Sequence, residues 1–306
     1  MRIVAYNLPQ KISSILKQKM GKKLIIHDKK LNDKTVDTKT EILIITIASS
    51  IGVKILKKMK KLKTIITAST GTNHIDLAEC SRREINVKNC PTYGSNGVAE
   101  LAIALSFAGL RKMNKMLEFG KELAYPKSFF YYLGSELAGK TCAVLGTGAI
   151  GSLIAKKLIC LEAKVIAYSH SENRELLGLG INYVKLNEAV AKADILFIAL
   201  PSTTETFHII GSKELLRMKK GASIVNIARG ELIDSDALLK HINRLGFAAT
   251  DVIEGEAALW LGKSGAGQVV NDLVKKDNFL IVPHIGSSTL EAQEKLAHEI
   301  LLATGI

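Results

Sequence analysis

The stretch from Thr141 to Gly151, which reads TCAVLGTGAIG, constrains the fold of this chain more than any other. A β-type run ends at Gly146, and apolar residues then recur at the helical spacing of positions 150, 153, 154, 158 and 161. The helix N-terminus in such a unit offers unpaired N–H groups to an anion. Gly146 would permit the tight turn, Gly148 the close approach of a pyrophosphate, and Gly151 the close packing of helix and strand. The stretch therefore predicts a dinucleotide-binding unit.

Further apolar runs repeat this rhythm along the chain. A second β-type run, 164–168, follows the predicted helix, and three more come later, at 194–200, 222–228 and 247–252. Helical or loop segments separate these runs, as in a doubly wound parallel sheet. A glycine-rich turn in an unrelated α/β domain is the competing interpretation of the first stretch, but it does not explain the later runs.

The first ninety residues show an alternation of their own. We predict strands at 2–6, 24–27, 41–47, 64–68 and 85–87, with helices at 9–20, 51–62 and 76–83. A loop at 89–96 leads into a long helix predicted from about Gly97 to Met116. A capping box, Ser288 to Glu291, is expected to open a final helix that returns to the first domain. The expected boundaries are 1–94 plus 286–306 for one domain and 95–285 for the nucleotide domain.

The composition suits a globular protein with two cores. The chain has 306 residues, of which 47% are hydrophobic. It begins with a strand pattern, so we expect no signal peptide, and no apolar run reaches the roughly 18 residues of a membrane span. The four cysteines have neither metal-ligand spacing nor the density of a secreted disulfide scaffold. We therefore expect a cytoplasmic protein with reduced thiols, no metal site and no membrane partner.

The net charge of +13 is concentrated at one end of the chain. Residues 1–63 hold sixteen basic and four acidic residues, a net +12, so the remainder is nearly neutral. Aromatic residues that would stack on bases are not interleaved with the lysines. We interpret the lysines as a solvated surface that helps to steer anionic ligands, and we expect no nucleic-acid partner.

Several short motifs occur in one order along nearly the whole chain. They are TGTNHIDL at 70–77, VAE at 98–100, the glycine turn at 146–151, Leu200-Pro201, NIARG at 226–230, DVIEGE at 251–256 and PHIG at 283–286. With these motifs the chain resembles the D-2-hydroxyacid dehydrogenase family. The resemblance implies an α/β protein of two doubly wound parallel-sheet domains, a Rossmann nucleotide domain inserted in a flavodoxin-like substrate domain. It also implies an enzyme that transfers a hydride between a nicotinamide cofactor and a small 2-keto or D-2-hydroxy acid.

Three residues at predicted strand ends fit that chemistry. His284 resembles the family's general acid/base, because imidazole titrates near neutral pH. Glu256 resembles its carboxylate partner, which would favour the imidazolium form. Arg229 presents the planar fork that grips a carboxylate, and it would also polarise the keto group. The family usually has a proline after the glutamate, whereas Ala257 follows here, so Glu254 competes with Glu256 for that role.

The resemblance assigns binding roles to further residues. Thr70 and Gly71 would hold the substrate carboxylate through backbone N–H groups, where glycine allows close approach. Tyr93 matches an active-site tyrosine of the family's D-lactate dehydrogenase branch, although a tyrosine simply buried between domains fits the sequence nearly as well. The predicted cofactor contacts are the pyrophosphate-binding backbone of Gly146, Gly148, Ala149, Ile150 and Gly151, Pro201 and Thr206 beside the adenosine, and Ala228 and Asp251 at the carboxamide.

The end of the second predicted strand of the nucleotide domain departs from the NAD-type pattern. An acidic residue is expected about twenty residues beyond the glycines, where it accepts the ribose hydroxyls. The sequence there is YSHSENR, so Ser169 takes the place. Ser169, His170 and Arg174 could bind a 2′-phosphate that a carboxylate would repel. We therefore predict NADP(H) over NAD(H), with loss of the acceptor in an ordinary loop as the alternative.

The substrate is less constrained than the reaction. Phosphoglycerate-using relatives carry arginines in the stretch that corresponds to 46–50, which has none here, and this argues against a phosphorylated acid. Glyoxylate, hydroxypyruvate, pyruvate and longer keto acids all remain open. By resemblance we expect a homodimer built on the long helix from about Gly97 and the aromatic segment 129–132. A cofactor-binding sensor of the same fold without turnover is the alternative function.

Overall fold

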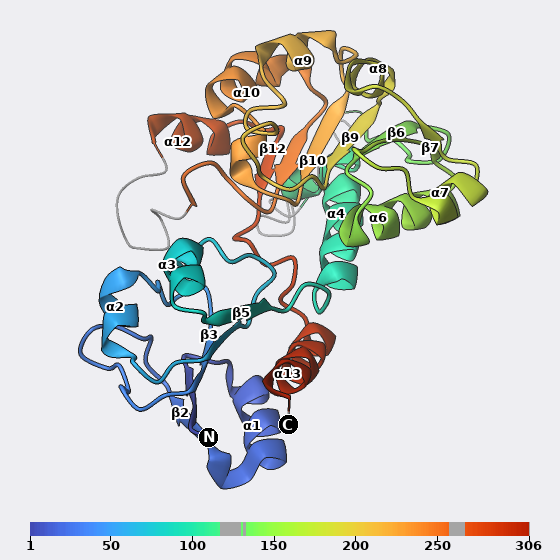
Figure 1. Cartoon of the computed structure of the whole chain (residues 1–306). Helices are drawn as coiled ribbons and strands as arrows, with labels where there is room; N and C mark the ends of the chain where they lie inside the picture. Colours follow the sequence, from blue (N-terminus) through green and yellow to red (C-terminus); the bar gives the residue numbers. More distant parts are fainter. Residues whose placement is uncertain (117–129, 131–132, 257–266, 306) are drawn as a thin grey trace. The chain divides into compact units, whose positions relative to one another are not determined.

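The computed structural model describes residues 1–116, 130, 133–256 and 267–305. The chain divides into two compact units (Figure 1). The first unit combines the two ends of the chain, Met1–Gly94 and Ser287–Ile306, and the second is the continuous segment Ser95–Gly286.

A parallel sheet of five strands forms the centre of the first unit. Its strands are β1 (Ile3–Tyr6), β2 (Leu24–His27), β3 (Ile42–Ile45), β4 (Thr64–Thr67) and β5 (Asn86–Asn89). They lie in the order β2-β1-β3-β4-β5, and every pair is parallel. This is the flavodoxin-like strand order, in which ligands bind at the carboxyl ends of the strands.

Helices cover both faces of this sheet. Side chains alternate along β1, so Ile3 and Ala5 enter one core while Val4 and Tyr6 enter the other. Residues of α1 (Gln10–Met20) and α13 (Leu290–Thr304) fill the first core, and residues of α2 (Val53–Lys58) and α3 (Leu77–Arg82) fill the second. A short 3₁₀ turn, η1 (Gly21–Lys23), links α1 to β2. Burial on both faces explains why the inner strands β1 and β3 are continuous apolar runs.

The predicted start of the last helix is wrong by one residue. The cap of α13 is Thr289, whose Oγ1 accepts a hydrogen bond from the N–H of Ala292 at 3.0 Å. Thr289 has the extended backbone of a cap, with φ −117° and ψ 159°, and a threonine hydroxyl serves there as well as that of Ser288. The S-T-L-E pattern therefore located the helix without locating its cap.

A seven-stranded parallel sheet forms the centre of the second unit. Its strands are β6 (Thr141–Leu145), β7 (Lys164–Tyr168), β8 (Asn182–Tyr183), β9 (Ile195–Ile198), β10 (Ser223–Asn226), β11 (Ala248–Thr250) and β12 (Phe279–Ile281). Their spatial order is β12-β11-β10-β9-β6-β7-β8, the Rossmann order extended by one strand. The order reverses between β6 and β9, so the glycine turn after β6 lies at the switch point. The predicted fold class is confirmed.

Two layers of helices enclose this sheet (Figure 1). Residues of α4 (Ser95–Leu110), α6 (Ala149–Cys160) and α7 (Arg174–Gly178) pack on one face. Residues of α8 (Leu186–Lys192), α9 (Ser212–Arg217), α10 (Ser235–His241) and α12 (Gln268–Val274) pack on the other. Two 3₁₀ turns, η3 (Gly230–Leu232) and η4 (Ile242–Arg244), flank α10.

The long helix of the second unit ends earlier than predicted. It stops at Leu110 instead of about Met116, because Lys112 adopts a left-handed backbone with φ 51° and interrupts the helical hydrogen bonds. Of the aromatic segment 129–132, only Phe130 lies among the described residues. In the described part of the chain, no helix combines the length and the apolar character needed to cross a membrane.

Candidate active site

Three of the predicted site residues follow three neighbouring strands. Arg229 comes after β10, Glu256 after β11 and His284 after β12, and these strands are adjacent and parallel. The carboxyl ends of parallel strands share one edge of the sheet, which is where open α/β sheets bind ligands. The topology therefore brings together residues that span 56 positions of sequence, from 229 to 284.

His284 and Glu256 form a hydrogen-bonded pair. The Nδ1 of His284 lies 2.8 Å from Oε1 of Glu256, and both side chains are partly buried. A carboxylate can only accept, so Nδ1 carries a proton. The other oxygen of Glu256 accepts from the N–H of Ile253 at 3.4 Å. Of the two competing glutamates, Glu256 is the one that the structure places on the histidine.

The environment of His284 favours its charged form. The hydrogen bond that Nδ1 donates to the Glu256 carboxylate raises the pKa of His284 above its usual value, although burial of the ring opposes this. The negative charges of Glu256 and Asp251 add to the increase, and the nearby positive charge of Arg229 lowers the pKa. The balance keeps a proton available on the imidazole above its ordinary titration range.

Asp251 holds the turn that carries His284. Its two carboxylate oxygens accept hydrogen bonds from the backbone N–H groups of Ile285 at 2.7 Å and Gly286 at 2.9 Å. The side chain is only 3% exposed, and burial raises its pKa against the effect of these two bonds. His284 itself has a left-handed backbone, with φ 52°, which is uncommon for a residue with a side chain. The sequence predicted Asp251 only as a carboxamide contact and missed this supporting role.

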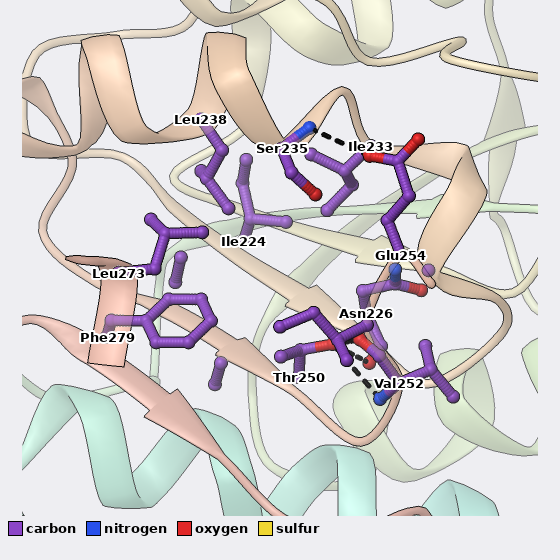
Figure 2. A pocket seen from close by; sticks show the side chains of 14 residues that line it. Ile224, Asn226, Ile233, Ser235, Leu238, Thr250, Val252, Glu254, Leu273 and Phe279 are labelled. Atoms are coloured by element: carbon purple, nitrogen blue, oxygen red, sulfur yellow. Dashed lines mark hydrogen bonds between the residues drawn. The ribbon is translucent and has the colours of Figure 1, made fainter. Parts of the chain in front are cut away.

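Glu254 serves a separate pair on the same loop. Its Oε1 lies 2.7 Å from Nε2 of His208, and its Oε2 accepts from the N–H of Ser235 at 3.3 Å. Figure 2 shows Glu254 directed at Ser235 beside a cavity enclosed by Ile224, Leu238 and Phe279. The cavity measures about 20 Å³, room for one water molecule and far too little for a substrate.

Asn226 fixes the turn that carries Arg229. Its amide group donates to the carbonyl of Arg229 at 2.9 Å and accepts from the N–H of Ala228 at 3.1 Å. The guanidinium donates to the carbonyl of Ala228 at 2.6 Å. The next residue, Gly230, has no room for a side chain, because a Cβ there would lie 2.0 Å from the carbonyl carbon of Ile253. The turns after β10 and β11 thus support one another directly.

The glycine turn has the geometry of a phosphate-binding loop. Gly146 has φ 91°, a conformation that side chains disfavour, and its N–H bonds the carbonyl of Tyr168 at 2.7 Å. A Cβ at Gly151 would lie 1.8 Å from the carbonyl oxygen of Gly146. By contrast, a Cβ at Gly148 would meet no atom within 4 Å, so the space in front of this residue is open.

The start of α6 offers backbone donors beside that open space. The N–H of Ser152 already bonds the carbonyl of Gly148. Among the described residues, no acceptor faces the N–H groups of Ala149 and Ile150, as expected for a first helical turn. Open space and free donors at a helix N-terminus fit the pyrophosphate of a dinucleotide.

The segment after β7 folds back onto the glycine turn. Asn173 caps α7 and donates through its amide to Oγ of Ser152 at 3.1 Å, and that hydroxyl donates to the carbonyl of Thr147 at 2.8 Å. The N–H of Thr147 lies 3.5 Å from Oγ of Ser169. We expected Arg174 to lie in the loop after β7, but it is the first residue of α7, because Asn173 caps the helix immediately before it. His170 and Arg174 are both exposed.

The segment after β9 forms a compact turn on the other side of the switch point. Oγ1 of Thr206 donates to the carbonyl of Pro201 at 2.7 Å and accepts from the N–H of Thr203 at 2.8 Å. Thr206 therefore fixes the shape of this turn, while Pro201 is exposed on it.

The remaining predicted site residues belong to the first unit. Thr70 and Gly71 follow β4 at the carboxyl edge of the five-stranded sheet. The hydroxyl of Tyr93 lies 3.5 Å from Oγ of Ser287, and its ring packs against the core that α1 and α13 share. Within the described residues, no cluster of histidine, cysteine and acidic side chains suits a metal ion, and all four cysteines are free thiols.

A family model matches more than half of this chain. The model describes the NAD binding domain of D-isomer specific 2-hydroxyacid dehydrogenases and matches residues 103–286. The matched region contains the glycine turn and the strand ends that carry Arg229, Glu256 and His284.

Individual proteins from three organisms resemble nearly the whole chain. The 2-hydroxyacid dehydrogenase homolog 1 of Schizosaccharomyces pombe is 34% identical over 90% of this chain and 86% of that protein. A hydroxypyruvate reductase of Thermotoga maritima is 32% identical over 85% of this chain and 82% of its own length. The crystal structure of a D-lactate dehydrogenase from Aquifex aeolicus, complexed with NAD and lactic acid, has a TM-score of 0.88 at 27% identity and covers 99% and 94% of the two chains.

Proposed function

The chain belongs to the D-isomer specific 2-hydroxyacid dehydrogenase family, and on that premise we propose that it reduces a small 2-keto acid with His284 as its acid/base. As a member of this family it is an oxidoreductase that uses a nicotinamide cofactor. The observation that carries the proposal is the 2.8 Å contact between His284 and Glu256, beside Arg229 at one sheet edge. A proton donor and a fixed cation are what ketoacid reduction requires of the protein.

Each of the proposed site residues has its own role in the reaction. When bound, a reduced nicotinamide supplies the hydride for the keto carbon. His284 donates a proton from Nε2 to the carbonyl oxygen, and in the reverse direction it takes the hydroxyl proton. Glu256 holds the ring through Nδ1 and stabilises the imidazolium. Arg229 binds the substrate carboxylate and stabilises the charge that develops on the carbonyl oxygen. We also assign Thr70, Gly71 and Tyr93 to substrate binding.

The glycine turn is our proposed site for the cofactor's pyrophosphate. Gly148, Ala149 and Ile150 present backbone to it, while Gly146 and Gly151 keep the turn tight. We place Pro201 and Thr206 beside the adenosine, and Ala228 and Asp251 at the carboxamide. The second unit is then the dinucleotide domain and the first the substrate domain.

A spectrophotometric assay with a panel of keto acids tests the function. We expect oxidation of reduced nicotinamide with at least one of glyoxylate, hydroxypyruvate, pyruvate or a longer 2-keto acid. Cofactor binding without turnover on the whole panel would instead indicate a sensor.

Glu256→Gln is expected to move the pH profile of keto acid reduction to lower pH. Reduction needs the imidazolium, so its rate falls as pH rises through the pKa of His284. The Glu256 carboxylate raises that pKa, so its removal should shift the alkaline limb to lower pH. The oxidation profile, which needs neutral imidazole, should shift in the same direction. A Glu254→Gln control should leave both limbs in place, because Glu254 pairs with His208; equal shifts in the two variants would contradict the assignment.

We further propose NADP(H) as the preferred cofactor, since Ser169 replaces the acidic ribose acceptor and Arg174 starts a helix held against the glycine turn. A charge-assisted hydrogen bond to a 2′-phosphate favours NADPH by roughly tenfold. We expect a higher kcat/KM with NADPH than with NADH, erased or reversed by Ser169→Asp. Both cofactors should be titrated at one ionic strength, because salt screens the phosphate contact. A wild-type preference for NADH would refute the phosphate site and leave the dehydrogenase assignment intact.

A homodimer is our proposed assembly, built on α4 and the segment 129–132. α4 is apolar around most of its circumference, with Leu101, Ile103 and Phe107 only partly buried, and such a helix is rarely left to solvent. Light scattering at micromolar concentration should give about twice the chain mass of 33.2 kDa. A mass of one chain would count against the dimer.

A further inference from the structure

Three consecutive peptide groups in the loop after β4 are held in place by hydrogen bonds to their carbonyl oxygens. The carbonyl of Ser69 accepts from the N–H of Cys90 at 3.0 Å. The carbonyl of Thr70 accepts from the side-chain amide of Asn89 at 2.7 Å, and that of Gly71 accepts from Oγ of Ser69 at 2.8 Å. Asn89 is the last residue of β5, the strand beside β4, and Cys90 follows it, so the end of this strand supplies two of the three donors.

The orientation of these carbonyls dictates the direction of the following N–H groups. The peptide bonds of this loop are trans, so each N–H points opposite to the carbonyl of the same peptide group. The N–H groups of Thr70, Gly71 and Thr72 are therefore directed away from Cys90, Asn89 and Ser69. No acceptor for these three N–H groups is found among the residues that the structure describes. Thr70 is exposed and the next two residues are partly exposed, so the donors are open to a ligand.

A chain of hydrogen bonds runs from His74 through the buried hydroxyls of Thr67 and Ser69 to the Gly71 carbonyl, and we call it the relay. Oγ of Ser69 lies 2.7 Å from Oγ1 of Thr67, which lies 2.9 Å from Nε2 of His74. Ser69 gives its only hydroxyl proton to the Gly71 carbonyl, so it must accept from Thr67, and Thr67 must in turn accept from His74. The relay thus has one direction, from the ring N–H of His74 to the Gly71 carbonyl. Thr67 is fully buried and Ser69 is 6% exposed, so water cannot readily replace either partner.

The relay works with a neutral histidine. Burial lowers the pKa of His74, and among the described residues no charged group opposes this effect. Both the neutral Nε2–H form and the imidazolium donate to Thr67, so the relay does not depend on pH in the neutral range. This distinguishes His74 from His284, whose role is to exchange a proton.

We propose that Asn89 and the relay His74–Thr67–Ser69 are positioning residues that orient the backbone N–H groups of Thr70, Gly71 and Thr72 to bind the carboxylate of a 2-keto acid. The inference rests on the proposed function, since it names the devices that shape the substrate loop. Successive backbone donors bind an oxyanion well when their directions are fixed before binding, because the loop then loses no conformational entropy on binding. Asn89 fixes the peptide group between Thr70 and Gly71, and the relay fixes the next one, between Gly71 and Thr72.

Two substitutions break the two devices separately. Thr67→Val removes the central hydroxyl of the relay with little change of shape, and Thr67→Ser restores it. Asn89→Ala removes the other donor at an exposed position, where loss of fold is not expected. Both Thr67→Val and Asn89→Ala should raise KM for the keto acid by roughly tenfold, whereas Thr67→Ser should stay near wild type. The cofactor Kd, measured by nicotinamide fluorescence without keto acid, should not change in any variant.

Direct binding of oxamate, an unreactive analogue of a 2-keto acid, gives a second readout. Its Kd for the enzyme with reduced cofactor should rise in parallel with KM in Thr67→Val and Asn89→Ala. Unchanged oxamate Kd in both variants would overturn the positioning role, as would a rise in Thr67→Ser equal to that in Thr67→Val. A wild-type enzyme that binds oxamate without turnover would refute the proposed function while this binding series still decides the positioning role. Failure of the wild type to bind oxamate at all would refute both.

Discussion

Replacing His284 with alanine is expected to lower kcat for keto acid reduction by about a hundredfold or more, with the cofactor Kd nearly unchanged. Loss of a positioned general acid typically has a cost of this size. The structure supplies the positioning: Nδ1 is held by Glu256 at 2.8 Å, and the backbone after the ring is held by both oxygens of Asp251. The measurement is steady-state turnover together with a fluorescence titration of the reduced cofactor.

His208 provides a matched control for this experiment. It is also a histidine with a left-handed backbone, φ 51°, and it also pairs with a glutamate, at 2.7 Å from Glu254. His208→Ala removes a histidine–carboxylate pair of the same kind from the same unit, so it reproduces the structural cost of His284→Ala. We expect its kcat to fall far less. Similar losses in the two variants would mean that His284 acts through structure, and near-wild-type activity in His284→Ala would remove it from the mechanism.

The second large effect is expected at Arg229. Arg229→Lys should raise KM for the keto acid and lower kcat, each by roughly tenfold or more, because lysine keeps the charge but loses the planar pair of donors. The carboxylate is bound in the ground state, which sets KM, and the carbonyl oxygen gains charge only in the transition state, which sets kcat. Initial rates over a range of keto acid concentration, at saturating cofactor, separate the two effects.

Arg244→Lys is the control for the arginine-to-lysine change itself. Arg244 lies in the same unit and donates to the backbone carbonyls of Leu216 and Met218 at 3.1 and 3.2 Å. Its replacement should change the melting temperature more than either kinetic constant. If Arg229→Lys lowered kcat while KM stayed constant, the carboxylate-binding role would be wrong and a role confined to the carbonyl oxygen would remain.

Buried polar side chains hold both of the turns that carry the proposed catalytic residues. Asp251 holds the turn of His284, and Asn226 holds the turn of Arg229. Both side chains are almost fully buried, at 3% and 1% exposed, and both form hydrogen bonds with backbone groups. Such contacts fix a catalytic side chain to within the small tolerance that efficient catalysis requires.

Several features of this protein were determined by the local sequence alone. The alternation of apolar runs with helical segments predicted two parallel sheets, and the strand–turn–helix order around Gly146 predicted the Rossmann unit; both predictions are confirmed. These features follow from nearest neighbours in the chain, since a strand buried on both faces must be apolar and a tight turn needs glycine. The order of short motifs predicted the family, which is also confirmed.

Other features depended on contacts between residues far apart in the sequence. Which of Glu254 and Glu256 meets His284 could not be read from spacing, because both lie within three residues on one loop and only the packing of that loop against β12 separates their partners. By contrast, the end of α4 at Leu110 and the cap of α13 at Thr289 depended on local backbone geometry that several sequences permit equally. The roles of Asp251 and of the relay from His74 to Gly71 required knowing which buried donors and acceptors face each other. Burial obliges every polar group to find a partner, but only the tertiary structure decides which partner it finds.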